Sequence, residues 1–179
     1  MKKPLVILEV ANNHMGDLKH LKKIINVYSK ITSKYKIKID FAIKFQFRDL
    51  ESYIHPTANK HNKGVIRFTS TRFNLSEWKE VVRFAKKKFK IICTPFDEKS
   101  IINIEKNRFD FLKIASCSYD DWPLIEKIKK SKLPVICSIG GAEENQITKL
   151  VSFFKKKIES NKFYLMYCVA LYPTKINDL

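Results

Sequence analysis

Two lysines interrupt strand-like runs that are otherwise apolar. Lys44 lies in F-A-I-K-F-Q-F and Lys113 lies in F-L-K-I-A-S. Burying an ammonium group without a partner is costly, so each lysine needs a carboxylate or an anionic ligand. Glu9, at the end of L-V-I-L-E, is a candidate partner. The pattern therefore predicts either a site for a phosphate or carboxylate, or an ion pair between Lys44 and Glu9 that is only structural.

Uncharged polar side chains occupy comparable places in the chain. Gln46 is two residues after Lys44, so the two side chains share one face of a strand. Hydroxyl and amide groups donate hydrogen bonds to phosphate oxygens, and a set of them at successive strand ends favours one shared anion site. Each hydroxyl taken alone is more often a simple helix cap. The candidates are Gln46, Thr94, Ser116 and Ser138.

Strands and helices are expected to alternate along the whole chain, which is typical of a parallel sheet. Asp17 and Ser76 are predicted to cap two of the helices. The expected strands are 5–11, 41–47, 91–94, 111–115, 134–138 and 163–169, and the expected helices are 18–34, 77–89, 98–107, 121–131 and 143–159.

Six strand–helix repeats define an α/β fold within a single domain over residues 1–179. A complete eight-fold (β/α) barrel needs about 250 residues. The fold is therefore either an open sheet or a TIM-type barrel with about six of its eight units. Residues 48–74 show no clear period and are too many for an ordinary loop, so we expect this segment to be functional.

The chain carries a net charge of +17, which suits nucleic acid or a small anion. Of its 35 basic residues, 30 are lysine and five are arginine. Specific recognition of bases favours arginine, so nucleic-acid binding is the weaker interpretation. The sequence contains no apolar run of the length that a membrane helix needs, and Glu9 and Asn12 interrupt any signal peptide. The four cysteines form no C-x-x-C pair, and we expect reduced thiols and a cytoplasmic location.

Six runs of residues resemble the sialic acid synthase (N-acetylneuraminate synthase) family. The resemblance implies the N-terminal portion of a TIM-barrel transferase that condenses phosphoenolpyruvate with an N-acetylated amino sugar such as N-acetylmannosamine. The product would be a nonulosonic acid for surface carbohydrate biosynthesis. The runs are E-V-A-N-N-H-M-G-D (9–17), A-I-K-F-Q (42–46), C-T-P-F-D-E (93–98), L-K-I-A-S (112–116), P-V-I-C-S (134–138) and C-V-A-L-Y-P-T (168–174).

By the same resemblance, Glu9, Lys44 and Lys113 are the catalytic residues. His14 is expected to line the pocket, and Arg48, Tyr53 and His55 are candidates for sugar contact. A divalent metal, Mn²⁺ or Mg²⁺, is the implied cofactor, and it would polarise the sugar aldehyde. The implied substrate-binding residues are Asn13, Gln46, Thr94, Ser116 and Ser138.

The sequence departs from the family pattern at three places. Tyr167 stands where the family has a metal-binding histidine, so we expect no metal ligand there. Ser116-Cys117-Ser118 replaces a run with a candidate general base, and Asp120 and Asp121 are poor substitutes because they should begin a helix. The chain ends before strands seven and eight and before the antifreeze-like domain of the family.

From these departures we expect impaired activity in this chain taken alone. The alternatives are a non-catalytic protein that binds phosphoenolpyruvate or another small anion, and a basic nucleic-acid-binding module. A homodimer is also expected, because the open edge of an incomplete barrel invites pairing.

Overall fold

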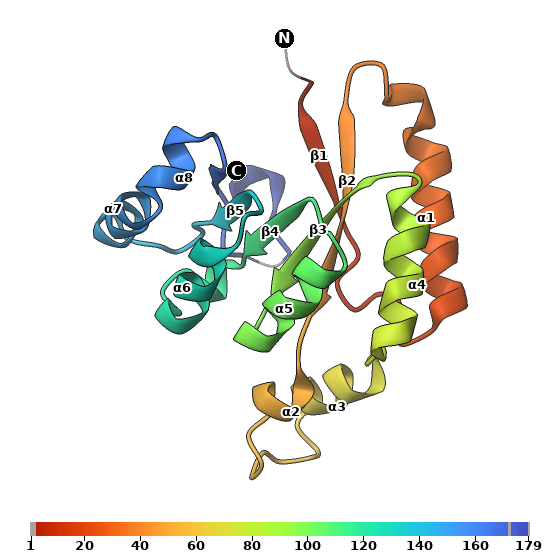
Figure 1. Cartoon of the computed structure of the whole chain (residues 1–179). Coiled ribbons are helices and arrows are strands. Elements are labelled where there is room, and N and C mark those ends of the chain that lie inside the picture. The colour runs from red at the N-terminus through yellow and green to blue at the C-terminus, as the bar shows by residue number, and fades with distance from the viewer. Residues whose placement is uncertain (1–2, 172, 179) are drawn as a thin grey trace.

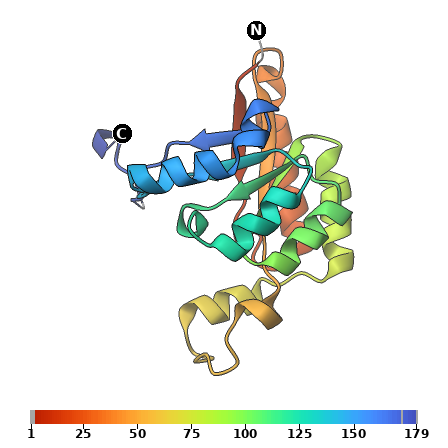
Figure 2. The ribbon, with the colours of Figure 1, turned by 60° about the vertical axis from the view of Figure 1, so that its left-hand side comes forward.

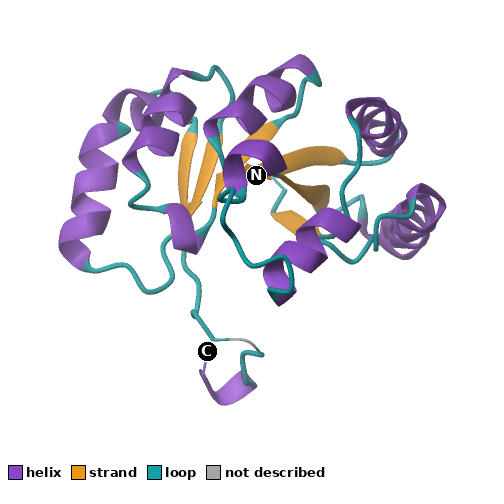
Figure 3. Ribbon diagram, turned by 90° about the horizontal axis from the view of Figure 1, so that it is seen from below, coloured by secondary structure: helices purple, strands orange, loops and turns teal. Residues whose placement is uncertain are grey.

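A single parallel sheet organises the computed structural model of the chain, which describes residues 3–171 and 173–178 (Figure 1). The six strands pair in chain order, from β1 to β6. Seen from below, the strands lie in the middle and the helices lie around them (Figure 3). The sheet is a curled half-barrel, so of the two predicted folds the incomplete TIM-type barrel is confirmed. The strands are β1 (Leu5–Glu9), β2 (Asp40–Phe47), β3 (Lys90–Pro95), β4 (Phe111–Ile114), β5 (Val135–Ser138) and β6 (Phe163–Met166).

Helices connect each strand to the next, and α1 and α4 pack side by side against the outside of the sheet (Figure 1). The segment between β2 and α4 carries two short helices that extend beyond the sheet (Figure 2). The α-helices are α1 (Leu18–Thr32), α2 (Leu50–Tyr53), α3 (Lys63–Ser70), α4 (Leu75–Lys86), α5 (Glu98–Lys106), α6 (Trp122–Lys130), α7 (Glu144–Phe153) and α8 (Lys155–Glu159). Short 3-10 helices are η1 (Ser33–Tyr35), η2 (Ser116–Ser118) and η3 (Ile176–Asp178).

The two faces of the sheet have different partners because successive strand side chains alternate between them. Phe45, Cys93 and Leu112 belong to the large core between the sheet and its helices. A smaller apolar cluster of Ala42, Ile92 and Ile136 covers the concave inner face. The inner face also carries the polar residues toward the carboxyl ends of the strands, so the apolar cluster forms the floor beneath them.

Strands β1 and β6 are the two edges of the sheet. Among the described residues, no further strand pairs with either edge. Val6 on β1 and Leu165 on β6 are consequently exposed. A cavity of about 570 Å³ opens on the concave side near the amino ends of the strands, lined in part by Leu5, Phe111 and Met166.

Most predicted elements are present with shifted ends. The strands expected at 5–11 and 163–169 are shorter, and the helix expected at 143–159 is divided into α7 and α8 at Phe154. Asp17 caps α1 as predicted, since its side chain accepts from the backbone N–H of Lys19 and His20. Among the described residues, no helix is both long and apolar enough to cross a membrane.

The predicted cap of the helix at 77–89 is wrong. The helix begins at Leu75, and its cap is Asn74 instead of Ser76. Asn74 Oδ1 accepts from the backbone N–H of Glu77 at 2.9 Å, and Glu77 Oε2 accepts from the backbone N–H of Asn74 at 2.7 Å. This reciprocal pair is a capping box, which Ser76 cannot form because Lys79 lies three residues later.

Replacing Asn74 by alanine should lower the free energy of unfolding by about 1 kcal/mol, because two backbone N–H groups of α4 lose their acceptor. Urea denaturation followed by circular dichroism measures the change. Ser76→Ala is the matched control and should cost less than about 0.5 kcal/mol. A larger loss from Ser76→Ala than from Asn74→Ala would contradict this assignment of the cap.

Candidate active site

Lys44, on the inner face of β2, is the centre of the site. Its Cα lies opposite that of Glu9 in the β1–β2 register. The ammonium group forms an ion pair with Glu9 and donates a hydrogen bond to Thr94 Oγ1 at 3.0 Å. Lys44 is 6% exposed, whereas the Glu9 side chain is 42% exposed and also accepts from the backbone N–H of Ala11 at 2.8 Å. The predicted ion pair between Lys44 and Glu9 is therefore present.

Lys113 contributes a second, half-buried ammonium group from β4. In the part of the chain that the structure describes, no carboxylate lies within 4 Å of it. Burial lowers the pKa of Lys113, and the positive charge of Lys44 lowers it further. Glu9 acts in the opposite direction but more weakly. The Glu9 carboxylate pairs with Lys44, so the charge of Lys113 is not balanced by an ion pair among the described residues.

Ser138 closes the inner row of polar residues at the end of β5. It is almost fully buried, and its Oγ accepts a hydrogen bond from Cys168 Sγ at 3.4 Å. Gly140 allows this approach, because a Cβ there would lie 2.8 Å from the Cys168 carbonyl oxygen. Burial raises the pKa of the neighbouring Cys137 thiol to about 12, so that thiol stays protonated at neutral pH.

Gln46 lies at the end of β2, beside a small polar pocket. Arg48 Nη2 donates to Gln46 Oε1 at 3.0 Å. Asn12, in the loop after β1, donates to Thr71 Oγ1 at 2.7 Å and lines the same pocket. The full lining is Asn12, His14, Gln46, Arg48, Leu50, Phe68, Thr71, Arg72, Phe73 and Trp78.

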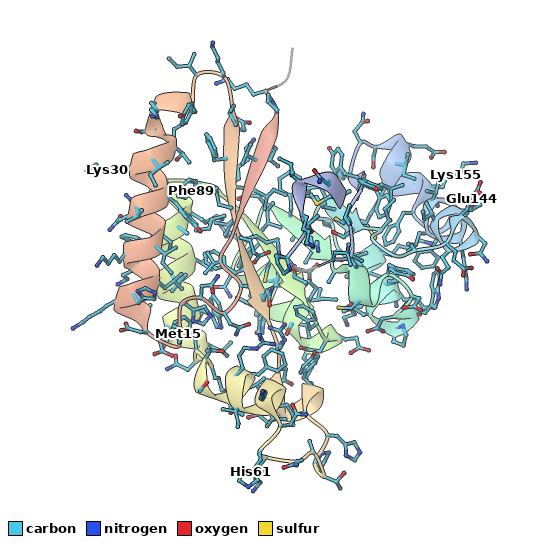
Figure 4. All side chains as sticks on the ribbon, turned by 180° about the vertical axis from the view of Figure 1, so that it is seen from behind. Met15, Lys30, His61, Phe89, Glu144 and Lys155 are labelled. Carbon is cyan, nitrogen blue, oxygen red and sulfur yellow. The ribbon has the colours of Figure 1, made fainter. Side chains whose placement is uncertain are left out.

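His14 lines this pocket, as predicted, from the loop that also carries Met15 (Figure 4). Its ring stacks on Phe73 with the centroids 4.6 Å apart, and Nδ1 accepts from the backbone N–H of Gly16 at 3.2 Å. The side chain is almost fully buried, and this burial lowers its pKa from 6.5 to about 4. At neutral pH His14 is a neutral ring that holds the loop against Phe73.

The predicted residues do not all lie equally close to the centre. Glu9, Lys44 and Thr94 are in direct contact. Asn13 is exposed, and its neighbour Asn12 lines the pocket instead. Ser116 begins η2 directly after β4 and is half-buried.

The remaining candidates lie farther out. Tyr53 packs near Arg48, with the guanidinium carbon 5.6 Å from the ring centroid. His55 is exposed and contacts Thr57. His61 lies at the far tip of the same segment, away from the strands (Figure 4). Asp121 caps α6, as expected, by accepting from the backbone N–H of Leu124.

The described residues do not provide a donor set for the metal that the resemblance implies. They contain no group of three or more His, Cys, Asp or Glu side chains that could hold an ion. The Glu9 carboxylate already pairs with Lys44, and Tyr167 is 79% exposed. Metal dependence therefore stays a prediction of the resemblance.

A sequence model of the NeuB family matches residues 31–179. The chain belongs to the NeuB family. It is 26% identical over 185 residues to the N,N'-diacetyllegionaminic acid synthase of Campylobacter jejuni, covering 100% of this chain and 55% of the relative. It is 25% identical to human N-acetylneuraminate-9-phosphate synthase, covering 97% of this chain and 49% of the relative. This NeuB chain thus spans about half the length of these curated relatives.

Solved structures agree with the family assignment. The spore coat polysaccharide biosynthesis protein E of Chromobacterium violaceum superposes with a TM-score of 0.88 at 41% identity, covering 98% of this chain and 52% of that one. The N-acetylneuraminic acid synthetase of Leptospira borgpetersenii, in complex with citrate, gives a TM-score of 0.81 at 30% identity, covering 99% of this chain and 58% of that one.

The buried neutral state of His14 predicts acid sensitivity. In the unfolded chain the His14 side chain has a pKa near 6.5, whereas in the folded chain its pKa is about 4. Between these pH values the unfolded chain therefore binds a proton that the folded chain does not. The stability is therefore fully present above pH 6.5 and falls as the pH drops toward 4, by at most about 3 kcal/mol. Urea denaturation at several pH values measures this slope. His14→Phe keeps an aromatic ring against Phe73 and should make the unfolding free energy less dependent on pH. An equally steep pH dependence in that variant would contradict the buried neutral state of His14.

Proposed function

We propose that this NeuB-family chain carries the phosphoenolpyruvate-binding part of a nonulosonic acid synthase. One observation carries the proposal: at the carboxyl ends of the barrel strands Lys44 pairs with Glu9, whereas Lys113 has no carboxylate within 4 Å among the described residues. In (β/α) barrels this end of the strands holds the chemistry. A small anion between the two ammonium groups would compensate the surplus charge.

Phosphoenolpyruvate suits this site better than a simple anion does. It carries both a phosphate and a carboxylate, and the site offers both ammonium and hydroxyl groups. Thr94, which contacts Lys44, and Ser138, at the end of β5, are almost fully buried and could complete the hydrogen bonds of the phosphate oxygens. The Leptospira relative was solved with citrate, which is also a small polyanion.

In the proposed reaction, carbon three of phosphoenolpyruvate attacks the aldehyde carbon of an N-acetylated amino sugar. Water then adds at carbon two, and phosphate leaves with cleavage of the C–O bond. Lys44 and Lys113 would hold the phosphate and stabilise the negative charge that grows on it as it leaves. Glu9 would keep Lys44 oriented through their ion pair and contact the sugar from its exposed side.

The acceptor sugar is proposed by analogy with the relatives. Their names specify synthases of N,N'-diacetyllegionaminic acid, N-acetylneuraminate 9-phosphate and pseudaminic acid. The proposed place for this sugar is the exposed side of the Glu9 carboxylate, above its ion pair with Lys44.

Removing either lysine should abolish binding of phosphoenolpyruvate, because the anion loses half of its positive partners. Titration calorimetry with Lys113→Ala and Lys44→Ala measures this loss. Lys90→Ala is the matched control: Lys90 also pairs with a carboxylate, Asp40, but at the amino end of the sheet. Equal affinity in Lys113→Ala and wild type would contradict the proposed site.

A phosphate-release assay separates synthesis from binding. With phosphoenolpyruvate, N-acetylmannosamine and Mn²⁺, release that requires Lys113 supports a synthase. Binding without release would favour the second candidate, a non-catalytic anion-binding protein, for which the exposed Tyr167 at the family's histidine position is the specific observation.

A further inference from the structure

Arg48 occupies an unusual environment at the end of β2. It follows Gln46 by two residues, so its side chain continues the inner row of Lys44 and Gln46. Its guanidinium carbon lies 3.8 Å from the ring centroid of Phe96 and 4.2 Å from that of Phe68. Two aromatic rings thus pack against the guanidinium and restrict its movement.

Arg48 has no acidic partner in the described part of the chain. No carboxylate lies within 4 Å of it, and its Nε is buried without a hydrogen-bond partner. Burial lowers the pKa of Arg48 from its ordinary value. An ion pair therefore does not explain why a guanidinium is held here. Its polar contacts are the hydrogen bond to Gln46 and an interaction with the Tyr53 side chain.

An arginine suits this place better than a lysine does. A planar guanidinium can stack on aromatic rings and at the same time donate hydrogen bonds from its edge, which an ammonium group cannot do. The chain otherwise uses lysine at 30 of its 35 basic positions. Arginine at position 48 is consistent with a role that requires both stacking on aromatic rings and a hydrogen bond to Gln46.

The hydrogen bond fixes which way the Gln46 amide faces. A guanidinium can only donate, so the group of Gln46 that faces Arg48 must be the carbonyl oxygen Oε1. The amide nitrogen of Gln46 is then on the opposite edge, with two N–H donors available to a ligand. A free glutamine could rotate and present its carbonyl oxygen instead.

We propose that Arg48 is a positioning residue that locks the Gln46 amide so that it offers donors, and thereby selects a ligand that accepts hydrogen bonds at this place. The inference rests on the proposed function, since phosphoenolpyruvate is the acceptor-rich ligand in question. Arg48 acts through Gln46 and does not itself contact that ligand.

A double-mutant cycle in phosphoenolpyruvate affinity tests the role of Arg48. Arg48→Lys should weaken binding about three- to tenfold, the size of one misplaced hydrogen bond. In a Gln46→Ala background the same change should have no further effect. Arg67→Lys is the matched control, because Arg67 is exposed in the same segment and also lies over Phe68. A loss from Arg48→Lys that persists without Gln46 would overturn the proposal.

Gln46→Glu gives an independent test that separates folding from binding. A carboxylate facing Arg48 forms an ion pair, so the urea midpoint should stay equal or rise while phosphoenolpyruvate binding is lost. A lower midpoint in this variant would overturn the proposed contact with Arg48.

The Gln46 side-chain amide can be followed by NMR whether or not phosphoenolpyruvate binds. Its N–H₂ signals, assigned with Gln46→Ala, should show one fixed environment in wild type and shift in Arg48→Lys but not in Arg67→Lys. Failure of wild-type binding with this signature intact would count against the proposed function alone. An unchanged Gln46 signal in Arg48→Lys would overturn the positioning role.

Discussion

The arrangement of the site depends on the unequal number of charges on the inner face of the sheet. The face carries two ammonium groups, from Lys44 and Lys113, and the Glu9 carboxylate pairs with that of Lys44. Each cation has lost part of its hydration, and their mutual repulsion adds to that cost. A protein tolerates such a site when a ligand of opposite charge restores the balance, and this requirement links the fold to an anionic substrate.

The rest of the structure keeps those two lysines where they are. The outer face of the sheet is fixed by the core beneath the helices, and the register of β1, β2 and β3 places Glu9 and Thr94 beside Lys44. The apolar cluster of Ala42, Ile92 and Ile136 lies on the same inner face, nearer the amino ends of the strands. Charge is therefore concentrated at the carboxyl ends of the strands, and the 48–74 segment extends past that end of the sheet (Figure 2).

The sequence predicts the placement of Lys44 and Lys113 in strands and the strand–helix alternation, because a charge inside an apolar run and a regular alternation of elements are both visible in the sequence. It does not distinguish Asn12 from Asn13, since the loop after β1 has no period and turns through positive φ at Ala11 and Met15. The cap at Asn74 could be predicted from the sequence, because Glu77 lies three residues later, the spacing of a capping box. The contact of Arg48 with Phe68 and Phe96 joins distant positions, so only the folded chain shows it.

The most direct test of the account is the side-chain pKa of Lys113, measured by NMR in lysine-labelled protein with and without phosphoenolpyruvate. The account predicts a value below the ordinary 10.5 in the free protein, and a rise when the anion binds between the two ammonium groups. A Lys113 pKa that is already ordinary in the free protein, or that does not move with phosphoenolpyruvate present, would contradict it.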